Sequence, residues 1–155
     1  MDCLPRLALV AAMLSTSTAL HAQNTAAGKW IAEFEVGMRN VNGEVSSTGT
    51  GRARMTLELR GDSVFGTWEV LDPVPPAGTA TRPLKGVFAN AVLKLETEAA
   101  ERRIMMNETE RRLKMVTRYE LTVQGDTITG TSRNVALGGE IEPPSRPFKA
   151  VREKD

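Results

Sequence analysis

Residues 111–124 read RRLKMVTRYELTVQ, and this stretch decides the fold. Its side chains alternate with a period of two, which is typical of a strand with one face buried and one exposed. Residues 99–116 are rich in Glu, Arg, Met and Leu, so a helix is the alternative there. The strand is favoured because the alternation is unbroken from Leu113 to Val123. The face predicted to point inward carries Leu113, Met115, Thr117, Tyr119, Leu121 and Val123.

The same stretch opens one of two similar hairpins. Residues 57–67 read LELRGDSVFGT, and residues 121–131 read LTVQGDTITGT. Glycine at the first central position suits a two-residue II′ turn, which places Leu59 opposite Val64 and Val123 opposite Ile128. Gly66 and Gly130 then face inward, where a missing side chain allows a sharp bend or makes room for a large neighbour.

Alternation elsewhere predicts a total of eight strands. The others cover residues 28–36, 52–60, 82–88, 91–106 and 147–152, with a bulge expected at 99–103. Tight turns are expected at Gly61-Asp62, Ala89-Asn90 and Gly125-Asp126. Longer loops are expected at 37–51, 72–81, 107–110 and 136–146. Alternate connections of a meander lie at opposite ends. The pattern therefore predicts an all-β, eight-stranded antiparallel up-and-down barrel with its long loops at one end.

The N-terminus has the order of a secretory signal. Arg6 precedes an apolar run from Leu7, and small or weakly polar residues follow as far as Ala22. The run is too short and too rich in Ser and Thr for a membrane span. We expect residues 1–22 to be a cleaved signal peptide, residues 23–155 to form a single β-barrel domain, and the protein to be periplasmic or secreted.

Cleavage would leave a domain without cysteine or histidine, because Cys3 and His21 are the sole residues of their kinds in the sequence. A disulfide, a thiolate nucleophile, a Ser–His pair and metal sites built on Cys or His are then excluded. We expect no catalytic residues, no metal and no cofactor. The formal net charge of +1 provides no field to attract nucleic acid or a membrane surface.

Gly28-Lys29-Trp30, at the start of the first strand, matches the Gly-x-Trp motif of lipocalins. On this motif and the pattern of loops, the chain resembles the calycin superfamily, and lipocalins in particular. The resemblance implies that Trp30 plugs the closed end and that Arg152, at the end of the last strand, packs over it. It also implies a small apolar or amphipathic ligand in the barrel interior.

Inward-facing aromatic side chains are the candidate lining of a ligand site. Packed core is the favoured interpretation of them as a group, because an eight-stranded barrel is just wide enough to be filled by its own side chains or to hold one small ligand. Trp68 and Tyr119 are the strongest candidates, since a buried indole N–H or phenol needs a hydrogen-bond partner that a ligand could supply. The residues expected to bind ligand are Trp68, Tyr119, Phe34, Met115 and Leu57.

Charged residues give weaker indications. Arginines at 102, 103, 111 and 112 are interleaved with glutamates at 98, 101, 108 and 110. We interpret them as a solvated, self-compensating hairpin, in preference to an anion or partner contact at the barrel mouth. Glu33 and Glu35 have a spacing that can serve glycoside hydrolysis, but they should face solvent.

The leading hypothesis is a non-catalytic barrel that binds a small apolar or amphipathic molecule. The alternative is a protein-interaction or inhibitor module acting through loops 37–51, 72–81 and 136–146. An enzyme using Tyr119 with carboxylates is the third hypothesis.

Overall fold

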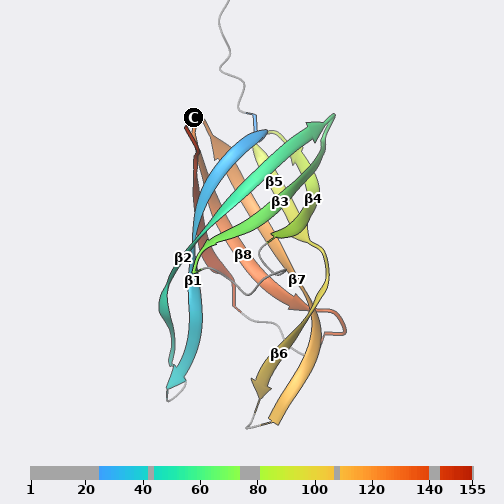
Figure 1. The fold of residues 1–155 in the computed structure, drawn as a ribbon. Helices are drawn as coiled ribbons and strands as arrows, with labels where there is room; N and C mark the ends of the chain where they lie inside the picture. The colour runs from blue at the N-terminus through green and yellow to red at the C-terminus, as the bar shows by residue number, and fades with distance from the viewer. Residues whose placement is uncertain (1–24, 42–43, 74–80, 107–108, 140–143, 155) are drawn as a thin grey trace, which may run out of the picture.

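The computed structural model describes residues 25–41, 44–73, 81–106, 109–139 and 144–154, and these residues form strands joined by turns (Figure 1). The predicted signal peptide and loop residues 74–80 and 140–143 lie outside them. No described helix could span a membrane. The strands are β1 (Gly28–Val41), β2 (Glu44–Arg60), β3 (Ser63–Asp72), β4 (Thr81–Ala89), β5 (Val92–Thr97), β6 (Ala100–Met106), β7 (Thr109–Gln124), β8 (Thr127–Ala136) and β9 (Arg146–Arg152).

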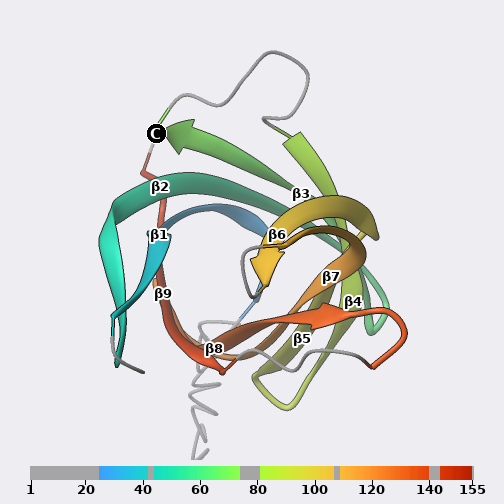
Figure 2. The same cartoon turned by 90° about the horizontal axis from the view of Figure 1, so that it is seen from below.

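The sheet closes into a barrel, as Figure 2 shows along its axis. Each strand pairs antiparallel with its neighbours in the order β5-β4-β3-β2-β1-β9-β8-β7-β6, and pairing of β5 with β7 closes the ring. Strands β5 and β6 pair with successive parts of β7, so together they occupy one place among eight. The predicted up-and-down barrel is confirmed, and the helical alternative for residues 99–116 is wrong.

The interruption between β5 and β6 falls at Glu98 and Ala99. The predicted bulge at 99–103 is therefore displaced, and residues 100–103 belong to a regular ladder in which Arg102 pairs with Leu113. Pairing moves along β7 from Arg118, opposite Glu96, to Met115, opposite Ala100. The break thus lets one long strand be covered by two shorter ones in succession.

Two predicted hairpins have the expected register. Leu59 pairs with Val64 and Val123 pairs with Ile128, and the first turn residues, Gly61 and Gly125, have φ values of 62° and 58°. A positive φ at this position is what a II′ turn requires, and glycine adopts it without steric cost.

The third tight turn was placed one residue early. Ala89 pairs with Val92, so the turn residues are Asn90 and Ala91, with φ values of 52° and 64°. Two positive φ values are characteristic of a I′ turn, which asparagine tolerates well. An alanine rarely adopts this conformation, so the turn at Ala91 is not predictable from residue preference.

The predicted first loop, residues 37–51, is wrong. Strand β1 continues to Val41 and β2 begins at Glu44, with Val41 paired to Glu44. The sequence between them is Asn42-Gly43, which is itself a strong signal for a two-residue hairpin turn and against a long loop. In Figure 1 this hairpin and the β6–β7 hairpin both extend beyond the lower end of the barrel.

Inward glycines let neighbouring backbones approach closely. A Cβ on Gly66 would meet the carbonyl oxygen of Thr56, and one on Gly130 would meet that of Glu120. Gly86 has the same relation to the carbonyl oxygen of Lys94. Of the two explanations offered by the sequence, the close backbone approach of a bent sheet is the one that these contacts support.

Gly86→Ala should therefore lower the free energy of unfolding by about 2 kcal/mol, because the added methyl group must displace a neighbouring strand. Urea denaturation measures the change, and Lys85→Ala, on the exposed outer face of the same strand, is the matched control. Equal stability of the two variants would contradict the close approach.

The end of the barrel with the tight turns is closed by Trp30 and Arg152. Trp30 is fully buried and donates its indole N–H to the carbonyl oxygen of Ala26 at 2.9 Å. The Arg152 guanidinium lies 4.1 Å from the centroid of the Trp30 ring. It also donates to the carbonyl oxygens of Ala27 and Thr25, and to the carboxylate of Asp126. This is the arrangement that the Gly-x-Trp motif implies.

Arg152→Ala should destabilise the barrel by about 3 kcal/mol, since it removes a cation–π contact and several charge-assisted hydrogen bonds. Arg152→Lys should recover only part of this loss, because an ammonium cannot reproduce the planar fork of donors. Thermal and urea unfolding test both variants, with Lys149→Ala on the same strand as control. A fully stable lysine variant would show that charge alone is sufficient.

Candidate ligand site at the open end of the barrel

An aromatic cluster fills the middle of the barrel. The ring of Trp68 lies 5.6 Å from that of Phe34, 5.8 Å from that of Tyr119 and 6.1 Å from that of Phe148. Tyr119 and Phe148 meet edge to face at 5.4 Å. These four side chains come from β1, β3, β7 and β9, so they join opposite walls of the barrel.

The structure brings together three of the five predicted ligand-binding residues: Phe34, Trp68 and Tyr119. Met115 is buried and lies nearer the open end of β7. Leu57 is buried at the closed end, where it pairs with Gly28 and Gly66. It is therefore part of the core beneath the aromatic cluster. Phe148 was missed, although the alternation of Phe148, Ala150 and Arg152 could have identified it.

On the side of the aromatic cluster away from the tight turns, towards the open end of the barrel, the interior becomes polar. Thr97 is buried, and its hydroxyl accepts the backbone N–H of Thr117 at 2.9 Å. The Thr117 hydroxyl donates to Oδ1 of Asn134 at 2.8 Å. Thr117, Ser132 and Asn134 are only half-buried, whereas inward positions near the tight turns, such as Val123 and Ile128, are fully buried. Solvent therefore reaches the open half of the interior.

Three arginine side chains also face the polar half of the interior. Side chains that face each other across an antiparallel pair point to the same side of the sheet. Arg82 pairs with the inward-facing Trp68. Arg146 pairs with Ser132, which in turn pairs with the inward-facing Tyr119. Arg102 lies on the same face of β6 as Ala100, the partner of buried Met115. All three arginines are half-buried.

Arg102 has an unusual environment for a cation. Its Nε is buried without a hydrogen-bond partner among the described residues. Burial lowers the pKa of Arg102 below its usual value, the charge of Arg82 lowers it further, Tyr119 opposes the change, and Arg146 adds to it. Arg82 and Arg146 thus lie close enough to Arg102 for their charges to act on it. Among the described residues, no carboxylate forms an ion pair with any of them.

The environment of Arg102 shows that the charged β6–β7 hairpin is not solvated throughout, contrary to the prediction from the sequence. Arg111 and Arg112 are exposed, as a solvated hairpin requires, but Arg102 points inward. The side chain of Arg103 lies outside the described residues. Strand parity places Arg102 on the inward face, because it pairs with Leu113, two residues from Met115. Arg111 shares that face but lies further along the hairpin, opposite Ile104, where it is exposed. The bulge predicted at 99–103 had hidden that parity.

Tyr119 lies next to these charges. Burial raises the pKa of its phenol well above the ordinary value, and the positive charges of Arg102 and Arg82 offset part of the rise. The described residues form no hydrogen bond to its hydroxyl.

The other predicted features lie apart from this site. Glu33 and Glu35 are exposed on the outer face of β1, as expected. Of the loops proposed to contact a protein partner, 37–51 is largely strand, while residues 74–80 of the second and 140–143 of the third lie outside the described residues. Leu137, after β8, is exposed. The described residues contain no group of three or more side chains suited to holding a metal ion.

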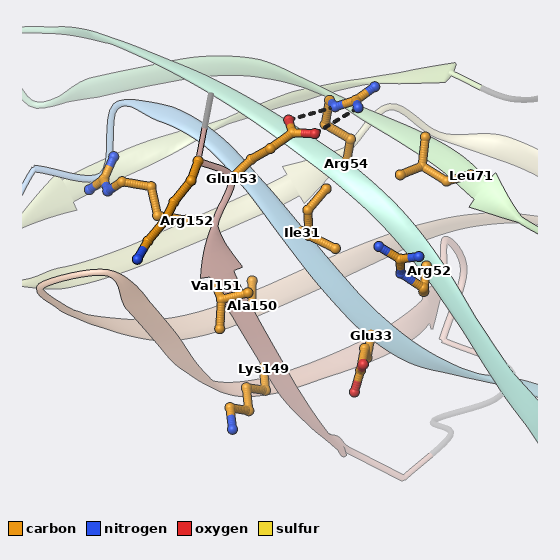
Figure 3. Close-up of a pocket in the computed structure, with 11 residues that line it drawn as sticks. Ile31, Glu33, Arg52, Arg54, Leu71, Lys149, Ala150, Val151, Arg152 and Glu153 are labelled. Atoms are coloured by element: carbon orange, nitrogen blue, oxygen red, sulfur yellow. Dashed lines mark hydrogen bonds and ion pairs between the residues drawn. The ribbon is translucent and has the colours of Figure 1, made fainter.

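A groove of about 760 Å³ lies on the outside of the barrel, across β1, β2 and β9 (Figure 3). At one end, Arg54 donates two hydrogen bonds to the carboxylate of Glu153, both at 2.8 Å, and a third to Glu69 at 3.1 Å. The bonds from Arg54 hold the pKa of Glu153 below its ordinary value. The most strongly bound charges of this groove are thus already paired with each other.

Comparison with protein families, with curated proteins and with solved structures finds no match to this chain. The chemistry of the interior is therefore the basis for inferring function.

The buried phenol gives a direct test of this site. Tyr119 is the single tyrosine of the sequence, so the near-ultraviolet absorbance of tyrosinate reports on it alone. We expect no ionisation of the folded protein as the pH rises through the ordinary value of 10.0. The unfolded state does lose its proton there, so stability is unaffected below that pH and decreases above it.

Spectroscopic titration of the folded protein, and of the protein in guanidinium, measures the two ionisations. Tyr119→Phe should remove this contribution to the alkaline loss of stability. Ionisation of the native phenol at its ordinary pH would show that the side chain is exposed to water.

Proposed function

We propose that this protein is a non-catalytic binding barrel that takes up a small amphipathic molecule through its open end. The apolar part of the ligand lies against the aromatic cluster, and its polar part lies among the half-buried polar side chains above. The observation that carries the proposal is the change within one interior, from fully buried apolar side chains to solvent-reached polar ones.

The aromatic side chains suit the apolar part of such a ligand. Phe34 and Val70 face inward but are only half-buried, so apolar surface remains in contact with water above Trp68. Covering that surface is favourable at about 25 cal/mol for each Å². Ligand pockets of this kind are mainly apolar with a few convergent polar groups.

Binding accounts for these residues better than catalysis does. A general acid or base should titrate near the working pH. The Tyr119 phenol is instead held protonated by burial, and the carboxylates on the neighbouring strands lie on the outer face. The inward polar groups are hydroxyls, an amide and arginines, which orient a ligand without exchanging protons with it.

The proposal extends to the class of protein. The closed antiparallel barrel and the Arg152–Trp30 contact are compatible with a lipocalin-like member of the calycins. The signal-like sequence of residues 1–22 supports export, with binding in the periplasm or outside the cell.

The fluorescent probe N-phenyl-1-naphthylamine tests interior binding, because it is apolar, uncharged and emits strongly only away from water. We expect saturable binding with energy transfer from Trp68. Ser132→Leu should weaken it about tenfold, because the larger side chain occupies the interior opposite Tyr119.

Thr131→Leu is the matched control, since it adds the same side chain to the exposed outer face of the same strand. Circular dichroism checks that each variant is folded, and Asn134→Leu, nearer the mouth, replaces Ser132→Leu if that variant is not. Equal binding by an interior variant and its outer control would contradict the proposed site.

A further inference from the structure

The three inward arginines carry an inference that rests on the proposed function and specifies its ligand. A cation that has lost part of its hydration needs a partner of opposite charge, because burial without one costs free energy. Arg102 has lost such hydration, and its buried Nε has no partner among the described residues. Arg82 and Arg146 reach the same part of the interior from β4 and β9.

We propose that the ligand is an anionic amphiphile, whose oxyanion group is bound by Arg82, Arg102 and Arg146 with the Tyr119 hydroxyl, and whose apolar body lies against the aromatic cluster. Guanidinium groups match this chemistry, since each presents a planar fork of donors to two oxygens at once. The protonated phenol supplies a further donor. The four groups come from four strands, β4, β6, β7 and β9, which belong to one half of the ring.

The surrounding charges favour an anion over a neutral polar group. The carboxylates on the neighbouring strands β3 and β5 are directed outward, where Glu69 pairs with Arg54 and Glu96 pairs with Arg118. No described carboxylate therefore competes for the inward arginines. A neutral ligand would leave the repulsion of Arg102 by Arg82 and Arg146 in place, whereas an oxyanion relieves it.

Two probes of nearly the same shape test the charge. The sulfonate 1-anilinonaphthalene-8-sulfonate is the anionic counterpart of the uncharged N-phenyl-1-naphthylamine. We expect the protein to bind the sulfonate at least tenfold more tightly. Arg102→Gln should reduce the affinity for the sulfonate about tenfold and leave that for the uncharged probe unchanged, as the loss of one charge-assisted contact requires.

The matched control is Arg118→Gln. Arg118 is next to Tyr119 in the sequence but lies exposed on the outer face, so the variant makes the same change in net charge without altering the interior. In the absence of any probe, Arg102→Gln should be at least as thermally stable as the wild-type protein, because it removes a half-buried cation that has no ion-pair partner among the described residues. A residue with a merely structural role would show a loss of stability instead.

Competition distinguishes an amphiphile from a free anion. Dodecanoate should displace the sulfonate probe at micromolar concentration, whereas inorganic phosphate at millimolar concentration should not. Displacement by phosphate alone would overturn the requirement for an apolar body.

The outcomes separate the two levels of the argument. Equal affinity for both probes, or the same loss in Arg102→Gln and Arg118→Gln, would overturn the anion site and leave interior binding intact. Binding of neither probe would contradict the proposed function itself.

Discussion

Closure of the sheet is the constraint on which the rest of the structure depends. Once β5 pairs with β7 and β9 pairs with β1, each strand position faces either a common interior or solvent. A shift of one residue in any ladder would exchange those faces along a whole strand. The tight turns at the closed end fix the registers of three hairpins. They therefore determine which side chains meet in the interior beyond Trp30, although those side chains lie some way along the strands from the turns.

The sequence predicts much of this because its signals are local. Alternation identified the strands, and the two Gly-Asp turns gave the registers that place Val64 and Ile128 in the core. Where it failed, a local signal was overlooked or misplaced: Asn42-Gly43 was passed over, and the turn at Asn90-Ala91 was set one residue early. In each case the strand was identified but its end was not.

The candidate site was predicted less completely, for a different reason. Trp68 and Tyr119 were assigned to the interior because they lie within clear alternating runs. The roles of Arg82 and Arg146 depend on pairing between strands, which a single strand does not reveal. Arg102 lies after the break that separates β5 from β6. Beyond that break, the alternation along the sequence no longer predicts which side chains face inward. Pairing of Arg102 with Leu113, on the inward face of β7, shows that Arg102 faces inward.

Charge distribution also explains why composition was uninformative about the ligand. The sequence has 20 basic and 19 acidic residues, and the balance suggests no electrostatic partner. The charges are distributed unevenly between the two faces of the barrel wall. Among the described residues, glutamates at outward positions pair with outward arginines, while three arginines face the interior. A nearly neutral protein can thus present a concentrated positive field to a molecule entering the barrel and little net field to one outside it. In the proposed site, selection by charge would operate within the mouth, where water is partly excluded and each guanidinium acts more strongly than it does on the surface.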